Sequence, residues 1–357
     1  MKNYKLIIYI LIFSIISIAS IYSSTFILSS NYKYIYLKQI IWYLVGFIIL
    51  YFLTKIKKNS FYKYSFILYV IFNILLILVL FFGDKINGSK AWFNIPKLGA
   101  FQPSEFMKII LIIYLADVLY KNRKKNDLIL IFKSFIITLI PSILTFLEPD
   151  TGNVIIYFII CISLLFISGI KKRWFIITLL ISIIFFSIFI YIYINKQILF
   201  INIFGTKFFY RIDRLINWKN KSGMQLDNAL AAIGSAPKNG YGLSKTPIYF
   251  PEAQTDFIIA IMFSNFGYYF GILFIILCYL FDYNILKICI KQENRNKYLV
   301  FGILTILIYQ QIQNIGMNLG VLPITGVTLP FISYGGSSLI SYMILIGLVF
   351  NINKKTS

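Results

Sequence analysis

The sequence predicts an all-α polytopic membrane protein with about ten transmembrane helices. Of its 357 residues, 59% are hydrophobic and 13% are charged, whereas soluble domains are usually about 45–50% apolar. About ten segments approach or exceed the roughly 20 apolar residues that cross a bilayer core. These segments and their loops use nearly the whole chain, so we expect a single integral membrane domain over residues 1–357.

The predicted spans follow one another along the chain with mostly short connections. The first apolar stretch is too long for the core of a cleavable signal peptide, so we expect it to be retained as the first helix. The ten spans are placed at 5–28, 36–54, 61–82, 105–120, 128–147, 152–170, 174–194, 257–281, 298–319 and 338–353. The longest connection covers about 195–256, between the seventh and eighth spans.

Short basic loops fall on one side of the predicted membrane. Lys and Arg are concentrated at 55–58, 121–125, 171–173 and 287–297, and short basic loops mark the cytoplasmic side. We therefore expect both termini in the cytoplasm and the loop 195–256 outside it. That loop is also basic, but long loops do not follow this charge rule.

The chain has a formal net charge of +22. Nucleic-acid binding is not expected, because the spans leave no soluble module to carry it. The outer loop holds eight Lys and Arg residues against four carboxylates. They form either a surface that faces lipid headgroups or a site for a polyanion such as a pyrophosphate; Arg211 and Arg214 are the first candidates for the second role.

Histidine is absent, and the three cysteines show neither metal-site nor disulfide spacing. Acid–base chemistry must therefore use carboxylates, lysines or tyrosines. The segment 99–108 (GAFQPSEFMK) has Ser104 as a helix cap and places Glu105 and Lys108 on one helix face. These two residues line a polar cavity or form a capping pair that orients the helix.

Two further acidic segments precede predicted spans. In EPDTGN (148–153), Asp150 is a good N-cap for the sixth span, and Glu148 is expected at the membrane interface. In FPEAQTDF (250–257), Asp256 either caps the eighth span or acts as a general base; if it is the base, Thr255 takes over the cap. The residue types alone leave both alternatives open.

A polar, proline- and glycine-interrupted segment covers 310–338. Irregular backbone at membrane depth is tolerated where it is buried in protein or lines a cavity. Its polar stripe forms hydrogen bonds between helices or, as we prefer, a cavity wall. The members of the stripe are Gln310, Gln311, Gln313, Asn314 and Asn318.

Several motifs together resemble the SEDS family of RodA, FtsW and SpoVE, over essentially the whole chain. They are GSKAWF (88–93), FQPSEFMK (101–108), EPDTG (148–152), YRIDRL (210–215), FPEAQTDFIIA (250–260) and NIGMNLGVLPITGVTLPFISYGGSS (314–338). The sequence has Gln254 where the family commonly has His.

This resemblance implies a peptidoglycan glycosyltransferase of the bacterial cytoplasmic membrane. Family members polymerise lipid II, an undecaprenyl-pyrophosphate-linked disaccharide-peptide, outside the membrane for elongation, division or sporulation. They work with a class B penicillin-binding protein, a transpeptidase. The resemblance implies that Asp256 is the essential aspartate and that Trp92, Glu105, Lys108 and Asp150 are the conserved residues near the substrate.

The implied reaction needs a base for the acceptor hydroxyl and stabilisation of the leaving pyrophosphate. The resemblance assigns no definite cofactor. One expectation is a divalent cation, Mg²⁺ or Mn²⁺, that bridges the pyrophosphate and carboxylates. Membrane lipid surrounds the spans. A flippase for the same lipid and a non-catalytic scaffold for a penicillin-binding protein remain alternatives. A flippase needs charges at mid-membrane, whereas Glu105, Asp150 and Asp256 are all predicted near the outer face.

Overall fold

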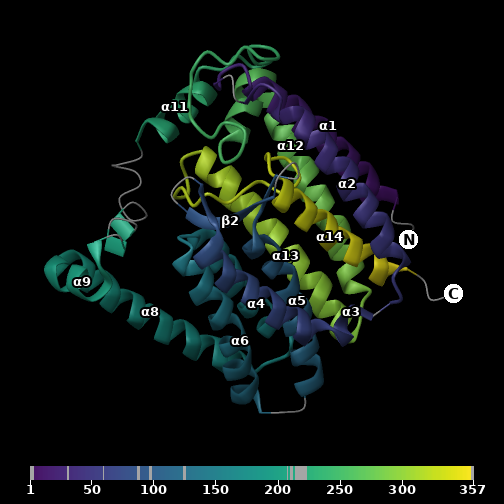
Figure 1. Ribbon diagram of the computed structural model, residues 1–357, viewed down its shortest axis with the longest axis vertical. Coiled ribbons are helices and arrows are strands. Elements are labelled where there is room, and N and C mark those ends of the chain that lie inside the picture. Colours follow the sequence, from purple (N-terminus) through teal and green to yellow (C-terminus); the bar gives the residue numbers. More distant parts are fainter. Residues whose placement is uncertain are drawn as a thin grey trace.

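A helix is present at each of the ten predicted spans (Figure 1). The computed structural model describes residues 4–29, 32–58, 60–86, 89–95, 99–123, 126–206, 208–209, 212–213 and 223–354. The helices at the spans are α1 (Tyr4–Ser24), α2 (Ile35–Lys55), α3 (Ser60–Lys63) with α4 (Ser65–Phe82), α5 (Pro103–Asn122), α6 (Asp127–Leu147), α7 (Thr151–Ile167), α8 (Lys172–Asn195), α12 (Ile258–Ile290), α13 (Asn294–Asn318) and α14 (Gly336–Asn353).

Seven of the described helices are long and apolar enough to cross a membrane: α1, α2, α4, α6, α12, α13 and α14. Large apolar side chains such as Phe66, Phe81 and Phe82 on α4 stay exposed, as expected of a surface that faces lipid. In contrast, α5 is buried along most of its length and carries charged residues at both ends. The prediction of an all-α polytopic membrane protein is confirmed.

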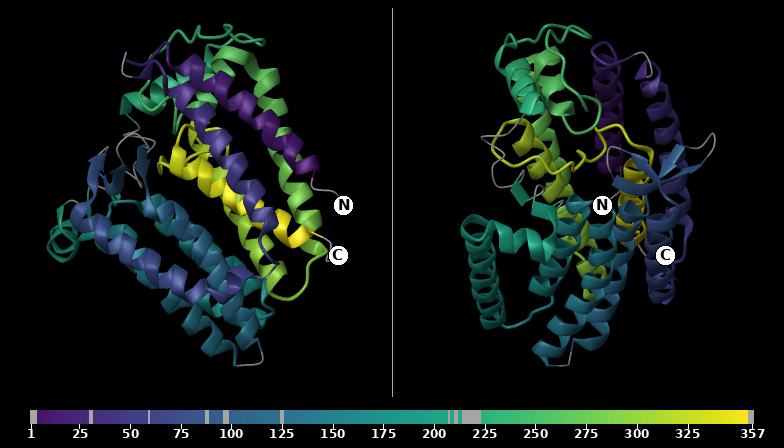
Figure 2. Two further views of the ribbon diagram at one scale, coloured as in Figure 1. Left: turned by 45° about the vertical axis from the view of Figure 1, so that its right-hand side comes forward. Right: turned by 60° about the vertical axis from the view of Figure 1, so that its left-hand side comes forward.

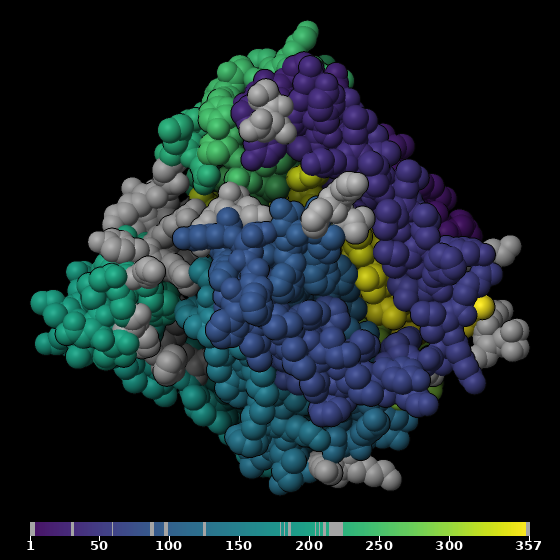
Figure 3. Space-filling model, viewed as in Figure 1, coloured from purple at the N-terminus to yellow at the C-terminus, as the bar shows by residue number. Residues whose placement is uncertain are grey.

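Small residues allow the closest helix contacts. A Cβ at Gly46 of α2 would lie 2.7 Å from Met343 of α14, and a Cβ at Gly347 of α14 would lie 2.6 Å from Leu53 of α2. Glycines on both sides therefore let the two backbones approach, as is typical of membrane helix pairs. In the space-filling view, yellow C-terminal residues are visible between the purple and blue segments (Figure 3).

A small antiparallel sheet follows α4, where the sequence predicted a loop. It consists of β1 (Asp84–Ile86), β2 (Ser89–Ile95) and β3 (Gly99–Phe101), in the order β1-β2-β3. Phe93 of β2 pairs with Phe101 of β3. The sheet is important for the site because β2 carries Trp92 and β3 leads directly into α5.

The long connection between α8 and α12 also contains helices that the sequence did not predict, α9 (Gln197–Phe204) and α11 (Gly223–Gly234). Figures 1 and 2 show α8 and α9 at the margin of the molecule, whereas α11 lies near the ends of α1 and α12. The backbone N–H of Ser244 donates to the hydroxyl of Ser23 on α1 (3.1 Å). This part of the connection therefore covers the end of the bundle where α1 ends.

The helix α12 continues to Ile290, well beyond the predicted end at 281, and is interrupted at Gly267. Gly267 has φ 84° and ψ 176°, a conformation that residues with a Cβ avoid. The kink frees two carbonyls of α12, which accept hydrogen bonds from the loop: Tyr241 N–H to Ser264 O (2.9 Å) and Gly242 N–H to Asn265 O (3.0 Å). The kink therefore attaches the connecting loop to α12.

Candidate active site

A polar cavity of ≈ 760 Å³ lies at one end of the bundle. Its wall is built from β2, the first residues of α5 and α7, the loop that enters α12, the side of α13 and the loop before α14. These segments lie far apart in the sequence. They meet because successive helices run in opposite directions, so that every second connection falls at the same end.

Four of the predicted site residues meet in this cavity. Trp92, Glu105, Asp150 and Asp256 all line it, and Glu252 joins them. The sequence placed these residues on separate segments, and the fold brings them to one wall. Their catalytic and binding roles stay predictions; their common location is a feature of the structure.

Glu105 and Lys108 form an ion pair on α5, as their spacing predicted. Lys108 Nζ lies 2.8 Å from Glu105 Oε2, and the lysine side chain is completely buried. The hydroxyl of Ser341 on α14 also approaches the same carboxylate oxygen (3.4 Å). Lys108 is absent from the described cavity lining; its predicted role at the substrate stays a prediction.

Asp150 joins α5 to α7. Its Oδ1 accepts the backbone N–H of Asn153 (3.1 Å), so the predicted N-cap is confirmed. Its Oδ2 accepts from the side chains of Asn153 (2.7 Å), Gln102 (2.9 Å) and Ser104 (3.3 Å). The prediction that Ser104 caps α5 is wrong: Gln102 is the N-cap residue, and the Ser104 hydroxyl bonds to Asp150 instead.

Glu148 is buried, whereas the sequence placed it at the interface. Among the residues that the structure describes, neither of its carboxylate oxygens has a hydrogen-bond partner. Burial, and secondarily the charge of Asp150, raises the pKa of Glu148 to about 9, because an apolar environment disfavours the ionised form. Glu148 is therefore a neutral acid at pH 7. Burial also raises the pKa of Asp150, against the effect of hydrogen bonds from Asn153.

Asp256 lies in a turn and does not cap α12. Phe257 is the N-cap residue, and the cap position has no polar side chain. The prediction that Thr255 takes over this role is also wrong, since its hydroxyl donates to Glu252 Oε2 (2.7 Å). The cap comes from another helix: Asn318 Oδ1 on α13 accepts the Ala260 N–H (3.2 Å).

Two asparagines of α13 hold the backbone of Asp256. The side-chain amides of Asn314 and Asn318 both donate to the Asp256 carbonyl, at 3.1 and 2.8 Å. Asn314 also donates to the carbonyl of Val327 (2.8 Å). The turn that carries Asp256 and the loop before α14 are therefore fixed to the same turn of α13.

The loop before α14 closes over the Asp256 turn. Gly326 has φ 71°, and a Cβ there would lie 3.8 Å from Asp256 Oδ2. Further along, Ser333 Oγ donates to the Thr255 carbonyl (2.6 Å) and Tyr334 N–H donates to the Gln254 carbonyl (2.9 Å). The glycine- and proline-rich segment therefore forms one wall of the cavity, as its irregular composition predicted.

Sequence reasoning missed three residues that support this loop. Ser17 of α1 donates to the Ile332 carbonyl (2.7 Å), Gln39 of α2 donates to the Ser333 carbonyl (3.3 Å), and the Tyr43 hydroxyl donates to the Phe331 carbonyl. A buried glutamine within an apolar span is a signal that could have found Gln39, because such residues usually have a specific partner.

Only one residue of the polar stripe of α13 lines the described cavity. Gln310 lines the cavity, but Gln311 donates to Asp282 of α12 (3.3 Å) and Gln313 donates to the Pro323 carbonyl (2.8 Å). With Asn314 and Asn318, most of the stripe connects segments of the protein. The preferred prediction of a cavity wall is therefore wrong for these four residues.

Cations are absent from the cavity lining among the residues that the structure describes. Arg211 and Arg214, predicted to contact pyrophosphate, lie outside the described residues. Within the described ranges, acidic and cysteine side chains form no cluster of three that could hold a metal ion.

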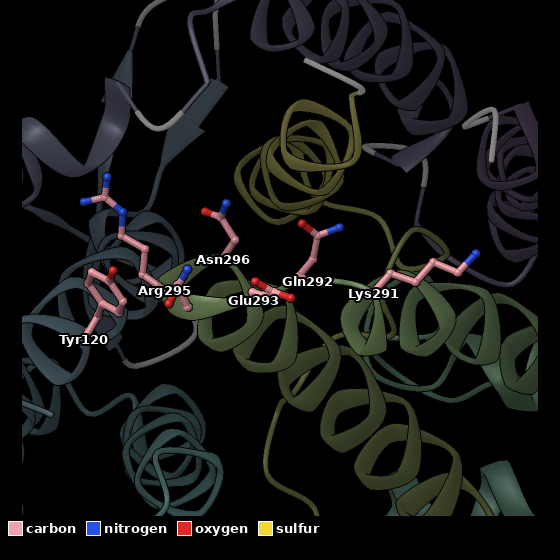
Figure 4. A pocket seen from close by; sticks show the side chains of 7 residues that line it. Tyr120, Lys291, Gln292, Glu293, Arg295 and Asn296 are labelled. Carbon is pink, nitrogen blue, oxygen red and sulfur yellow. The ribbon is translucent and has the colours of Figure 1, made fainter. Parts of the chain in front are cut away.

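A second cavity of ≈ 390 Å³ lies at the opposite end of the bundle, around the turn between α12 and α13 (Figure 4). Lys291, Glu293 and Arg295 line it together with Tyr120 of α5. Arg295 pairs with Asp117 (3.2 Å), which also pairs with Lys121. Because its acidic lining consists of Glu293 alone among the described residues, we place the active site in the first cavity.

The fold and the first cavity define an integral membrane protein with a carboxylate-lined polar site at one end of its helix bundle. The cell cycle protein family of FtsW, RodA and SpoVE matches residues 2–357. The chain belongs to this family, which confirms the predicted resemblance.

Relatives agree with this assignment. The chain is 33% identical over 339 residues to a probable peptidoglycan glycosyltransferase FtsW of Wigglesworthia glossinidia brevipalpis, covering 90% of this chain and 84% of that protein. It is 30% identical over 289 residues to stage V sporulation protein E of Bacillus subtilis strain 168, covering 75% and 72% of the two proteins.

Solved structures share the fold. One is a chain of a peptidoglycan synthase complex described as coordinating polymerization and crosslinking. It matches with a TM-score of 0.81 and 21% identity, and the match covers 99% of this chain and 98% of that chain. Another is the rod shape determining protein RodA of Thermus thermophilus, with a TM-score of 0.71, 21% identity and coverage of 99% and 97%.

Proposed function

We propose that this chain is a peptidoglycan glycosyltransferase that polymerises lipid II into β-1,4-linked glycan strands. The observation that carries this proposal is the convergence of Trp92, Glu105, Asp150 and Asp256 on one cavity in a member of the FtsW, RodA and SpoVE family. The relatives named as probable peptidoglycan glycosyltransferases support the reaction class.

In the proposed reaction, Asp256 is the general base. The C4 hydroxyl of the acceptor sugar attacks the anomeric carbon of the donor, and its proton passes to the Asp256 carboxylate. The new glycosidic C–O bond forms as the bond from the anomeric carbon to the pyrophosphate oxygen breaks. The pyrophosphate leaves with both electrons of that bond, and the configuration at carbon inverts.

The other cavity residues would bind and orient the sugars. Carboxylate oxygens of Glu105 and Asp150 accept hydrogen bonds, and sugar hydroxyls and amides supply donors. Trp92 offers an aromatic surface in the same wall. We assign the pyrophosphate to cations of the basic loop, with Arg211 and Arg214 as first candidates. If an Mg²⁺ or Mn²⁺ ion takes part, carboxylates that line the cavity would hold it, and it would stabilise the negative charge of the leaving pyrophosphate.

We propose that the cavity opens at the outer face of the bacterial cytoplasmic membrane and that both termini lie in the cytoplasm. Along the chain, the basic loops at 121–125, 171–173 and 287–297 alternate with the connections that form the cavity. They therefore fall at the other end of the bundle, and short basic loops mark the cytoplasmic side. We further propose a class B penicillin-binding protein as the partner; the peptidoglycan synthase complex of similar fold supports this.

The flippase alternative is less well supported. Asp282 is a buried carboxylate within α12, but it accepts a hydrogen bond from Gln311 of the neighbouring helix (3.3 Å). The residues that line the large cavity gather instead at one end of the bundle. This arrangement fits chemistry at a membrane surface better than a route across the membrane.

The test is the variant Asp256→Asn, assayed for glycan-strand formation from lipid II in liposomes with the partner present. We expect the rate to fall about 100-fold or more, because Asn cannot accept the proton. Folding should be little changed, since Asn318 and not Asp256 caps α12. Strand synthesis at the wild-type rate by this variant would overturn the assignment.

A matched control is Asp227→Asn. Asp227 is an exposed aspartate of α11 and lies outside the described cavity lining. We expect this variant to polymerise at the wild-type rate. A comparable loss in both variants would indicate a general effect of charge on this face of the molecule.

A further inference from the structure

The backbone of Glu252 is strained. Its φ of 57° places it in the left-handed region, which residues with a Cβ rarely adopt. Such conformations persist where surrounding contacts hold them, and they are concentrated at functional sites. Glycine would take the same φ without a steric penalty, so the presence of a glutamate side chain here needs a separate explanation.

Glu252 closes a six-residue turn on itself. Its Oε2 accepts from the Thr255 hydroxyl (2.7 Å) and from the Gln254 side-chain amide (3.3 Å). Its backbone carbonyl accepts the N–H groups of Thr255 (3.2 Å) and Phe257 (3.1 Å). Asp256 lies between these last two residues, so both of its neighbours are bound to Glu252.

The same turn is held from outside by other segments. Ser333 and Tyr334 bind the carbonyls of Thr255 and Gln254, and Asn318 binds the carbonyl of Asp256. These contacts reach the backbone from the loop before α14 and from α13. The carboxylate of Glu252 provides the contact from inside the turn, and both Glu252 and Asp256 line the cavity.

We propose that Glu252 is a positioning residue for Asp256. Its carboxylate fixes the turn in the conformation that presents the Asp256 side chain to the cavity, so that the base does not become a helix cap. The expected effect of Glu252 on the polymerisation rate rests on the proposed function. Precise placement of a base is important because a displacement of about 1 Å can lower a rate about 100-fold.

Three variants separate the carboxylate from the backbone strain. Glu252→Gln keeps a side-chain oxygen that accepts from Thr255. Glu252→Ala removes this acceptor and keeps the strain, whereas Glu252→Gly removes both. Each variant is compared for hydrogen exchange of a peptide covering 250–257, for Tm, and for kcat and apparent KM with lipid II.

We expect hydrogen exchange over 250–257 to be about tenfold faster in the Ala and Gly variants and close to wild type in the Gln variant. The Gly variant should have a higher Tm than the Ala variant, since it relieves the strained φ. In both, kcat should fall at least tenfold with apparent KM within about twofold, and the Gln variant should recover most of kcat.

Wild-type exchange and wild-type kcat in Glu252→Gly would overturn the proposal, because the backbone alone would then set the turn. A loss of kcat in Glu252→Gln as large as in Glu252→Ala would also overturn it, by assigning the charge a direct role. Glu293→Ala, at the opposite end of the bundle, is the control and should match wild type. An inactive wild-type protein would count against the proposed glycosyltransferase, while the exchange data still decide the role of Glu252 in the turn.

Discussion

The acidic residues around the cavity differ in their surroundings, and these differences separate their chemistry. Glu105 is paired with a buried lysine (2.8 Å), and Asp150 accepts four hydrogen bonds from neighbouring groups. Glu148 is buried, and neither of its oxygens has a hydrogen-bond partner in the described part of the chain. Burial raises the pKa of Glu148 to about 9, because an apolar environment disfavours the ionised form, so Glu148 is neutral at pH 7.

The raised pKa of Glu148 predicts a specific dependence of stability on pH. The folded protein keeps the Glu148 proton up to about pH 9, whereas the unfolded chain loses it near pH 4.5. Between these values the folded state binds more protons, so this group's contribution is fully present below about pH 4.5 and is lost as pH rises to about 9. The loss is at most about 1.4 kcal/mol per pH unit.

The variant Glu148→Gln tests this dependence. Its side chain is neutral at every pH, so its Tm should equal that of wild type near pH 5 and exceed it increasingly toward pH 8.5. The measurement is thermal unfolding of the detergent-solubilised protein across this range. A Tm difference that does not change with pH would contradict the prediction, because it would show that the pKa of Glu148 is the same in the folded and unfolded states.

At the scale of elements, the start of α12 depends on α13. Asn318 accepts the N–H of Ala260 and donates to the carbonyls of Asp256 and Asn314. The helix that carries the proposed base on its entering turn is therefore capped by a residue that follows Ala260 by 58 positions in the chain. The position of the base and the packing of α13 cannot vary independently.

We expect Asn318→Ala to lower the free energy of unfolding by about 1–3 kcal/mol, because buried polar groups lose a partner. It should also lower the polymerisation rate by loosening the Asp256 turn. Asn284→Ala is the matched control, since the Asn284 side chain bonds to Leu280 of its own helix. A thermal melt and a polymerisation rate equal to wild type in Asn318→Ala would contradict this role of Asn318.

At the scale of the whole molecule, the antiparallel succession of helices decides which residues share an end. The cavity gathers connections that follow α4, α6, α11 and α13, whereas the second cavity lies at the turn from α12 to α13. Short basic loops accompany the second cavity, whereas the basic residues near the first cavity belong to the long connection 195–256. The proposed orientation in the membrane rests on these short basic loops.

Cysteine labelling in intact protoplasts tests the orientation. After removal of Cys161, Cys278 and Cys289, a cysteine at Lys245 should react with an impermeant thiol reagent, because this exposed residue lies in the loop near the cavity end. A cysteine at Lys172, exposed at the start of α8, should react after the membrane is made permeable. The reverse pattern would invert the proposed topology.

The sequence by itself determined the membrane class, the positions of helices at the ten predicted spans, and the family. The length of each apolar segment predicts a span from local sequence. The C-terminal motif identifies the family from its residue order alone, so neither inference needs the fold. It also determined the Glu105–Lys108 pair and the Asp150 cap, because helix spacing and N-cap chemistry depend on residues three or four positions apart.

The tertiary structure alone decided which side chains meet across segments. Asn318 replaces Thr255 as the cap of α12, Ser104 turns from its own helix to Asp150, and Glu148 becomes buried. Each outcome depends on a neighbour distant in sequence or on exclusion of water, and neither is encoded in local spacing. The strained turn at Glu252 is of the same kind, because contacts from α13 and the loop before α14 help to hold its backbone in place.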